Sequence, residues 1–549
     1  HIYRHCMTTF MNCQFMNCNI TENGGAILIT NDSPEINRTE SLILSDCIFN
    51  KCDSLNGAVI QGTTTCNPTI QRCTVSNCNG GHYIISLFFN TVQQFVSVDD
   101  CTFIGNYFKG TSTSDSGGIG LWIAHEKGMS VDKLTITFNR CFFISNRAAK
   151  NGGAFAYGES PTLKNISLSF SRCVFNGNTC DGGNGGALFI SVNQQVTITD
   201  CDFSENKCNG ANTKGSAVFI SSPSEIVAIR DSHFNGCQAI DGAVYSTSST
   251  NNLVITGTMF NNCGSSKSGS SICSSSKKFT FQSSTISFDI DNDQTKSRGI
   301  QITSKSNVIL SDSHFYNCQG SSEGGSIKID MSNGETKESL LIRSCIFENS
   351  NSLNGCAMFV KMNVEPTLEK ITIRNCTSGN YVITFIFTSF VESVTLKEGI
   401  FEFNEFKNNA YPPIPDGGGS GIWIANEGLK YDDKLKTLYF ENCLWYRNQV
   451  QESSSLKYGG GFAYGTSTTT KNTEINFDQC RFIQNKAKEK GGALYLCTNG
   501  QVSIIDCLFD GNEAQEGSNI YLETKSNVTI EYTQITRGKG GNQKGAVFI

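Results

Sequence analysis

The sequence predicts an all-β fold, namely a right-handed, single-stranded parallel β-helix of about 17 turns. A C-x-F-x-x-N/C motif recurs along the 549 residues, and a strand of alternating polar and apolar residues precedes most copies. Many copies are followed by Gly-Gly-Ala and further alternation. Alternation with a period of two is typical of strands with one buried face, and no helical periodicity competes with it. Because one such unit cannot bury its apolar face alone, the repetition predicts stacked turns.

The motif predicts columns of identical side chains. Stacked turns place each strand about 4.8 Å from its own copy, so Phe would lie on Phe and Cys on Cys inside the solenoid. We expect the Asn to occupy the corner, because Asn tolerates positive φ and its amide can bind the next Asn. The predicted ladder residues are Cys101, Phe103, Asn106, Cys141, Phe143, Asn146, Cys173, Phe175, Asn178, Cys201, Phe203, Asn206, Cys480, Phe482, Asn485, Cys507, Phe509 and Asn512. Cys takes the place of the Asn in seven other copies, at Cys18, Cys52, Cys78, Cys237, Cys263, Cys318 and Cys376.

Glycine pairs predict a second tight corner in each turn, since glycine accepts positive φ without steric cost. A longer period is also present. Residues 1–246 match residues 301–549 with an offset near 300; for example, Gly120–Ala124 corresponds to Gly421–Ala425. The chain is therefore predicted to be a tandem duplication within one continuous solenoid, with module 1 at 1–300 and a shortened module 2 at 301–549. We expect a longer parent chain.

Composition excludes several classes of function. The formal net charge is −6 and no run of basic residues is present, so we expect no nucleic-acid partner. No apolar stretch reaches 18 residues, so no transmembrane helix is expected in this piece. The two most apolar stretches, 83–98 and 381–396, are interrupted by polar residues and are predicted as strands. N-x-S/T sequons make glycosylation candidates of Asn19, Asn31, Asn37, Asn165, Asn375 and Asn527.

The 25 cysteines are an odd number, so not all can pair within the chain. Motif cysteines in neighbouring turns have parallel Cβ vectors about 4.8 Å apart, longer than the roughly 3.8 Å of a disulfide. We therefore expect reduced ladders of buried thiols. Cys180 and Cys208 are the best candidate for a disulfide, because each follows its motif Cys by seven residues in successive turns. No CxxC pair has a matching second pair, so no structural metal and no cofactor are expected.

Strings that suggest catalysis are weak, and we expect no enzyme and no catalytic residue. Trp122-Ile-Ala-His125 is faintly similar to a pectate lyase string, but its duplicate at 423–426 ends in Asn. The glycine-rich string 181–186 occurs once and lacks the repetition of calcium-binding β-rolls. The string 320–324 fits G-x-S-x-G by letters only, because a strand and no helix follows it.

The paired G-G-A-[ILVF] and F-x-x-N motifs resemble those of the polymorphic membrane proteins of chlamydiae and the similar surface proteins of parasitic protists. The resemblance covers essentially the whole chain. It implies a β-helical region displayed on the cell surface and used in adhesion, and the family has no catalytic residues to carry over. The Cys-for-Asn copies and the scattered sequons depart from the bacterial pattern and favour a protist surface protein.

These observations predict a non-enzymatic, extracellular or cell-surface adhesin or display rod. Its binding chemistry is expected in loops such as 407–419 and 449–456, and its partners would be host or cell-surface glycans or proteins. One alternative is a structural subunit of an extracellular filament that associates end to end through unpaired strands. The other is a polysaccharide-degrading enzyme similar to pectin lyases.

Overall fold

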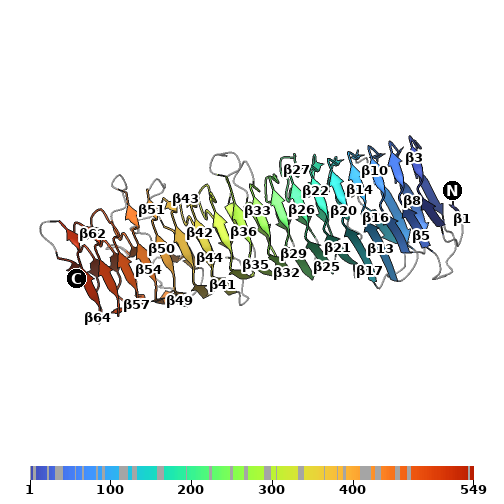
Figure 1. The fold of residues 1–549 in the computed structure, drawn as a ribbon. Helices are drawn as coiled ribbons and strands as arrows, with labels where there is room; N and C mark the ends of the chain where they lie inside the picture. The colour runs from blue at the N-terminus through green and yellow to red at the C-terminus, as the bar shows by residue number, and fades with distance from the viewer. Residues whose placement is uncertain are drawn as a thin grey trace. The chain divides into compact units, whose positions relative to one another are not determined.

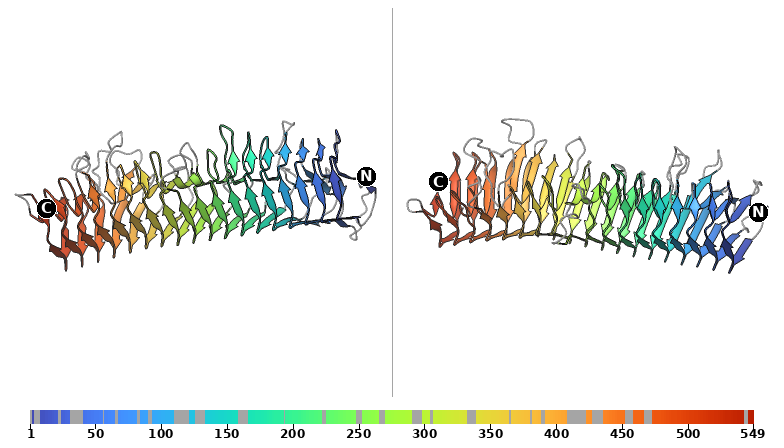
Figure 2. Two further views of the ribbon diagram at one scale, coloured as in Figure 1. Left: turned by 45° about the horizontal axis from the view of Figure 1, so that its top comes forward. Right: turned by 90° about the horizontal axis from the view of Figure 1, so that it is seen from above.

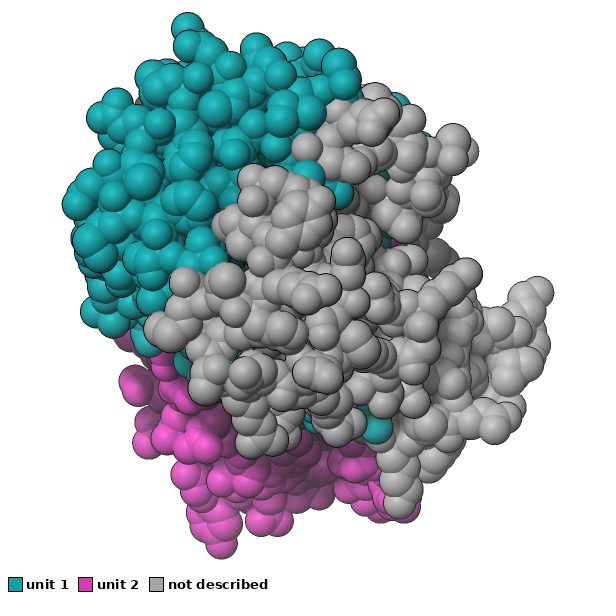
Figure 3. All heavy atoms as spheres, turned by 90° about the vertical axis from the view of Figure 1, so that its right-hand side faces the viewer, with its two compact units in different colours: residues 1–278 teal, residues 279–549 magenta. Residues whose placement is uncertain are grey.

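A computed structural model gives the fold of the protein. It describes residues 2–3, 8–21, 24–30, 41–55, 57–64, 67–81, 84–89, 93–109, 121–125, 133–157, 166–192, 194–221, 225–247, 252–264, 270–289, 298–303, 306–331, 339–363, 365–379, 381–387, 391–407, 422–426, 435–451, 458–465, 472–541 and 545–549. The chain divides into two compact units, His1–Lys278 and Phe279–Ile549 (Figure 3). The duplication predicted a boundary at 300/301, and the continuity of one solenoid through it stays a prediction. Within the described residues every regular element is a β-strand.

Each unit is a β-solenoid of stacked parallel strands, as the predicted fold class required (Figures 1 and 2). A complete turn contains a long strand, the Cys corner, a short motif strand, the Asn corner, a two-residue corner strand and a strand that follows the glycine pair. All strand pairs in the described part of the chain join one turn to a neighbouring turn in parallel register. Backbone groups are therefore satisfied between turns.

The long strands alternate buried and exposed side chains, as the period-2 pattern predicted; β21, for example, has three buried residues alternating with three half-buried ones. They are β2 (Thr8–Met11), β5 (Ser41–Ser45), β9 (Asn67–Gln71), β13 (Gln93–Asp99), β17 (Lys133–Asn139), β21 (Ile166–Ser171), β25 (Gln195–Thr199), β29 (Ile226–Arg230), β32 (Asn252–Thr256), β35 (Lys278–Gln282), β38 (Asn307–Ser311), β41 (Ser339–Arg343), β45 (Pro366–Glu369), β49 (Val391–Lys397), β53 (Leu435–Glu441), β57 (Glu474–Asp478), β60 (Val502–Ile505) and β64 (Val528–Glu531). The apolar stretches 83–98 and 381–396 contribute strands, as predicted.

The motif strands carry the Phe column. They are β3 (Gln14–Met16), β6 (Ile48–Asn50), β10 (Thr74–Ser76), β14 (Thr102–Ile104), β18 (Phe142–Ile144), β22 (Val174–Asn176), β26 (Asp202–Ser204), β30 (His233–Asn235) and β33 (Met259–Asn261) in unit 1, and β36 (Thr285–Ser287), β39 (His314–Tyr316), β42 (Ile346–Glu348), β46 (Thr372–Arg374), β50 (Ile400–Glu402), β54 (Leu444–Tyr446), β58 (Arg481–Ile483), β61 (Leu508–Asp510) and β65 (Gln534–Thr536) in unit 2. The number of turns thus differs slightly from the 17 predicted. The prediction missed β65, whose turn has Thr533 and Ile535 where the motif has Cys and Phe.

The glycine pairs precede a further set of strands. These are β1 (Ile2–Tyr3), β4 (Ile27–Thr30), β8 (Ile60–Thr64), β12 (Ile85–Phe89), β16 (Leu121–His125), β20 (Phe155–Tyr157), β24 (Leu188–Ile190), β28 (Val218–Ile220), β31 (Val244–Ser246), β34 (Ser270–Ser274), β37 (Arg298–Ile302), β40 (Ile327–Asp330), β44 (Met358–Met362), β48 (Ile383–Phe387), β52 (Ile422–Asn426), β56 (Phe462–Tyr464), β59 (Leu494–Cys497), β63 (Ile520–Glu523) and β67 (Val547–Phe548). The first glycine has positive φ, as at Gly152 and Gly491 (φ +63° and +64°). The second allows close stacking, because a Cβ on Gly153 would lie 2.2 Å from the Gly186 carbonyl oxygen.

The two-residue corner strands follow the Asn corner. They are β7 (Asp53–Ser54), β11 (Asn79–Gly80), β15 (Tyr107–Phe108), β19 (Arg147–Ala148), β23 (Thr179–Cys180) and β27 (Lys207–Cys208) in unit 1, and β43 (Asn351–Ser352), β47 (Thr377–Ser378), β51 (Glu405–Phe406), β55 (Gln449–Val450), β62 (Glu513–Ala514) and β66 (Lys539–Gly540) in unit 2. The range 449–456 was predicted to be a loop, yet it begins with β55, because its backbone pairs with β51 of the preceding turn.

Positive φ occurs at two further positions in most described turns, one residue before the motif Cys and one before the Asn. Asp100 (φ +54°) precedes Cys101, and Gly105 (φ +62°) precedes Asn106. The expectation that the Asn itself takes positive φ was wrong. The Asn is instead held in place by its side-chain hydrogen bonds, and the preceding residue makes the bend.

Candidate functional site

Three buried columns form the scaffold on which any site must be built. The Phe rings stack nearly parallel, with centroids 4.9 Å apart for Phe143–Phe175 and 4.8 Å for Phe482–Phe509. Contacts of this kind add to the hydrophobic stabilisation of the core. The predicted ladder residues Cys101, Phe103, Asn106, Cys141, Phe143, Asn146, Cys173, Phe175, Asn178, Cys201, Phe203, Asn206, Cys480, Phe482, Asn485, Cys507, Phe509 and Asn512 are all at most 2% exposed.

The Asn column is fully hydrogen-bonded. Asn146 Nδ2 donates to Asn178 Oδ1 (3.0 Å) and to the Phe103 carbonyl (2.9 Å), while its backbone N–H also donates to Asn178 Oδ1 (3.1 Å). Unit 2 repeats the arrangement from Asn404 to Asn512. Asn404 was not among the predicted ladder residues, because Gly399 replaces the Cys of its turn.

Cysteine replaces Asn in other turns because its sulfur takes over one of these bonds. The backbone N–H of Cys52 donates to Cys78 Sγ (3.4 Å), just as that of Cys78 donates to Asn106 Oδ1 (2.9 Å). The motif cysteines are buried except for the half-buried Cys13 and Cys18, and every described cysteine is a free thiol. Burial raises the pKa of Cys345 to about 12, which keeps this thiol protonated and unreactive at neutral pH.

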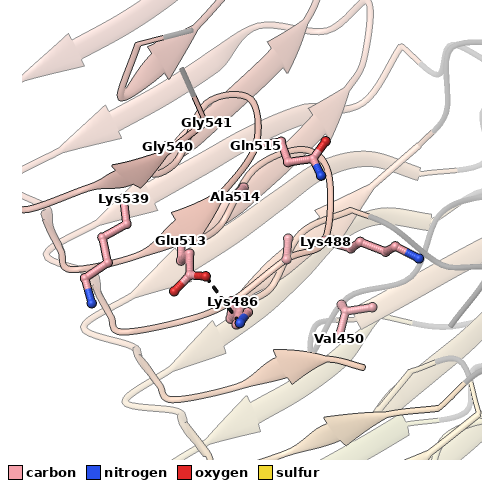
Figure 4. A pocket seen from close by; sticks show the side chains of 10 residues that line it. Val450, Lys486, Lys488, Glu513, Ala514, Gln515, Lys539, Gly540 and Gly541 are labelled. Atoms are coloured by element: carbon pink, nitrogen blue, oxygen red, sulfur yellow. Dashed lines mark ion pairs between the residues drawn. The ribbon is translucent and has the colours of Figure 1, made fainter. Parts of the chain in front are cut away.

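Unit 2 carries two adjoining hollows beside its last corner strands. One has a volume of about 630 Å³ and is lined by Val450, Lys486, Ala487, Lys488, Glu513, Ala514, Gln515, Lys539, Gly540 and Gly541 (Figure 4). The other has a volume of about 500 Å³ and is lined by Arg447, Asn448, Gln449, Gln484, Asn485, Lys486, Gly511, Glu513, Arg537 and Lys539. Because the hollows share Lys486, Glu513 and Lys539, they form one site, which we call the lysine groove.

Small residues form the floor of the lysine groove. Val450, Ala487, Ala514 and Gly540 occupy the same position in successive turns, the second residue of the corner segment. The neighbouring positions pair in register, with bridges from Gln449 to Lys486 and from Lys486 to Glu513.

The walls of the lysine groove are predominantly cationic. Among the described lining side chains five are basic and one is acidic: Arg447, Lys486, Lys488, Arg537 and Lys539 against Glu513. Lys486 pairs with Glu513 (3.2 Å), and Figure 4 shows Lys488 and Lys539 on opposite sides of this pair.

Two of these cations keep an uncompensated charge. Arg447 Nε donates to the neutral Gln484 Oε1 (2.7 Å). Lys539 is exposed and has no carboxylate partner among the described residues. A positive surface therefore lies on a chain whose net charge is −6.

The equivalent corner of unit 1 has different chemistry. Cys180, Cys208 and Ala239 form a buried cluster at the positions of Ala487, Ala514 and Gly540. The sulfurs of Cys180 and Cys208 lie 2.7 Å apart, and burial raises the pKa of Cys208. The two cysteines remain a candidate disulfide. Beside them Asp181 occupies the place of Lys488 and pairs with Arg147 (2.8 Å).

The other predicted sites are dispersed. The sequon asparagines Asn19, Asn375 and Asn527 are exposed, whereas Asn31, Asn37 and Asn165 lie outside the described residues. His125 ends β16, whose side chains are not described. The Glu323 of the 320–324 string pairs with Lys328 (2.7 Å) and has no nucleophile elbow around it. In the described part of the chain no group of three or more His, Cys, Asp or Glu side chains could hold a metal.

The expected binding loop 407–419 lies outside the described residues except for Lys407, which pairs with Glu405 (3.2 Å). The lysine groove was missed by sequence reasoning. A usable signal was present, because each small floor residue follows the Asn-column position by two residues. The three lysines follow that position by one or three residues, and Arg447 and Arg537 precede it by one. Finding it required that the turns be aligned on the Asn column rather than on Phe alone.

No protein-family model matches the chain, and no curated protein matches its sequence. Among the described residues no helix is long and apolar enough to cross a membrane.

Proposed function

We propose that the chain is a non-enzymatic, extracellular display scaffold that acts as an adhesin at a cell surface. The observation that carries this proposal is the contrast between constant columns and a variable corner. In both units Asn side chains hydrogen-bond to the Asn of the next turn, and Phe rings stack on the Phe of the next turn. The corner that follows the Asn presents a thiol cluster in unit 1 and a cationic groove in unit 2.

A scaffold of this kind separates stability from recognition. Because the columns supply the core, surface residues at the corners can change without loss of the fold. The exposed sequon residues Asn19, Asn375 and Asn527 are compatible with secretion. The raised pKa of the buried Cys345 thiol would slow its oxidation in an oxidising compartment. The similarity of the motifs to those of polymorphic membrane proteins supports the same proposal.

The proposal is tested with purified full chain coated on beads. We expect the beads to adhere to cells or to immobilised cell-surface glycans, and soluble chain should compete for the binding. Chain unfolded in denaturant and coated in the same amount is the control, since recognition by a folded surface is lost on unfolding. Equal adhesion by folded and unfolded chain, or no adhesion by either, would overturn the adhesin role.

A further inference from the structure

We propose that the lysine groove binds a linear anionic glycan, one that bears carboxylate or sulfate groups on successive sugars. This inference rests on the proposed adhesin function and names the chemical class of its ligand. The groove combines uncompensated cations, a small-residue floor and side-chain amides within one described surface.

The cations are arranged to meet a repeating anion. Lys486 and Lys539 stand in one column, two turns apart, and strands of neighbouring turns are separated by about 4.8 Å. Arg447 precedes Asn448 by one residue and lies one turn before Lys486, which follows Asn485 by one residue; both side chains line the same hollow. A polymer that runs along the stacking direction would therefore meet a new basic side chain at intervals of one or two turns, similar to the length of a sugar unit.

The floor and the amides favour a sugar over other anions. Ala487, Ala514 and Gly540 leave room for a ring to approach the backbone. Gln449, Gln484 and Gln515 place amide groups at the wall, and amides both donate to and accept from hydroxyl groups. Among the described lining residues of the two hollows there is no aromatic side chain, whereas single-stranded nucleic acids are bound by stacking on aromatic rings. Glu513 remains paired with Lys486 and would limit the density of negative charge that the groove accepts.

The duplicated unit supplies an internal comparison. Asp181 stands where unit 2 has Lys488, and Cys180 and Cys208 fill the places of Ala487 and Ala514. At the unit 1 corner the cation Arg147 is thus neutralised by Asp181, so binding should map to unit 2.

The test measures binding of the full chain to heparin oligosaccharides, oligogalacturonate, neutral dextran and a single-stranded oligonucleotide. We expect binding to one or both acidic glycans that weakens with added salt, and none to dextran. The triple variant R447Q/K488Q/K539Q should bind the acidic glycans about tenfold more weakly, since each exposed charge contributes modestly. The matched control K51Q/R172Q/K278Q removes the same charge from exposed positions of unit 1 and should bind as the unmodified chain does.

Each outcome decides the inference. Heparin carries sulfate groups and oligogalacturonate carries carboxylates only, so the two probes distinguish the two sources of negative charge. Binding to either probe supports the proposed glycan site. Equal weakening by both triple variants would show a general charge effect and overturn the site. Preference for the oligonucleotide, or for dextran, would overturn the ligand class. If coated chain adheres to cells while the triple variant adheres equally well, the groove is wrong and the adhesin function stands; if neither adheres, the adhesin function itself fails.

Discussion

The corner after the Asn column in unit 1 and its counterpart in unit 2 show how a duplicated solenoid diverges. The same two positions hold Cys180 and Cys208 in one unit and Ala487 and Ala514 in the other. The first pair belongs to a buried thiol cluster, and the second pair lines a groove of about 630 Å³. The Phe and Asn columns next to these corners are the same in both units. The difference teaches that recognition can change at a position whose neighbours remain fixed by stacking.

Truncation of the Phe column tests whether the shared scaffold is equally important in both units. Phe175→Ala and Phe482→Ala should each destabilise their own turn by about 3–5 kcal/mol, because a fully buried ring leaves a cavity. Hydrogen exchange of amides in the flanking motif strands measures the loss locally, which suits a repeat protein. A large effect in one unit and none in the other would contradict the equivalence of the columns.

Oxidation tests the difference between the two corners. A mild oxidant should join Cys180 to Cys208 in the native chain, and closing this 28-residue separation should stabilise unit 1 by about 3 kcal/mol. Peptide mapping by mass spectrometry identifies the crosslink. The double variant A487C/A514C places the same pair in unit 2 and should form a second crosslink there. The double variant C180A/C208A should form no crosslink at the unit 1 corner. Preferential crosslinking of motif cysteines instead would show that the corner pair is not special.

The Asn column offers a smaller and more selective test. Asn178→Ala should destabilise unit 1 by about 2–3 kcal/mol, because it leaves the Asn146 amide and the Phe143 carbonyl without their partner. Asn178→Cys should cost less, since natural turns use a cysteine sulfur to accept the same backbone N–H. Asn485→Ala and Asn485→Cys provide the matched pair in unit 2. Chemical denaturation ranks the four variants, and equal losses for Ala and Cys would show that the sulfur does not substitute for the amide.

Acid should have the smallest effect, and it should be similar in the two units. The Arg72 guanidinium and the Ser45 hydroxyl lower the pKa of Asp46 to about 2, and Arg537 lowers the pKa of Asp510. A carboxyl group whose pKa is lower in the folded chain stabilises the fold at any pH above its ordinary, unfolded pKa. This stabilisation is lost as the pH falls through the pKa of the folded state. Because both pairs lie at the surface, the loss should be small. Carboxyl titration by NMR measures the pKa of Asp46, and the variant D46N identifies its signal. Titration of Asp46 at the ordinary aspartate pKa would contradict the stabilising role of the pair.

The sequence was sufficient to predict the fold, because the Cys, Phe and Asn positions recur with spacing that only stacked turns satisfy. It was insufficient where a turn lacks the marker residues: β65 has Ile535 in the Phe column, and Asn404 follows a turn whose Cys is Gly399. The bend was assigned to the wrong residue because Asn is common both in corners and in hydrogen-bonded ladders. The lysine groove was missed because a two-residue strand is too short to show alternation, and its signal appears only when the turns are aligned on the Asn column.

The residues with positive φ before each corner limit which substitutions the sequence can accept. Among the non-glycine residues of the described chain with positive φ there is no valine, isoleucine or threonine, because branching at Cβ is incompatible with that backbone geometry. Charged, amide and even aromatic side chains occupy these sites instead, as Arg140 and Tyr532 do. Each turn thus exposes two places where almost any unbranched side chain can be exchanged by point mutation while three residue types stay excluded. Surface side chains can therefore change there, turn after turn, without disturbing the interior.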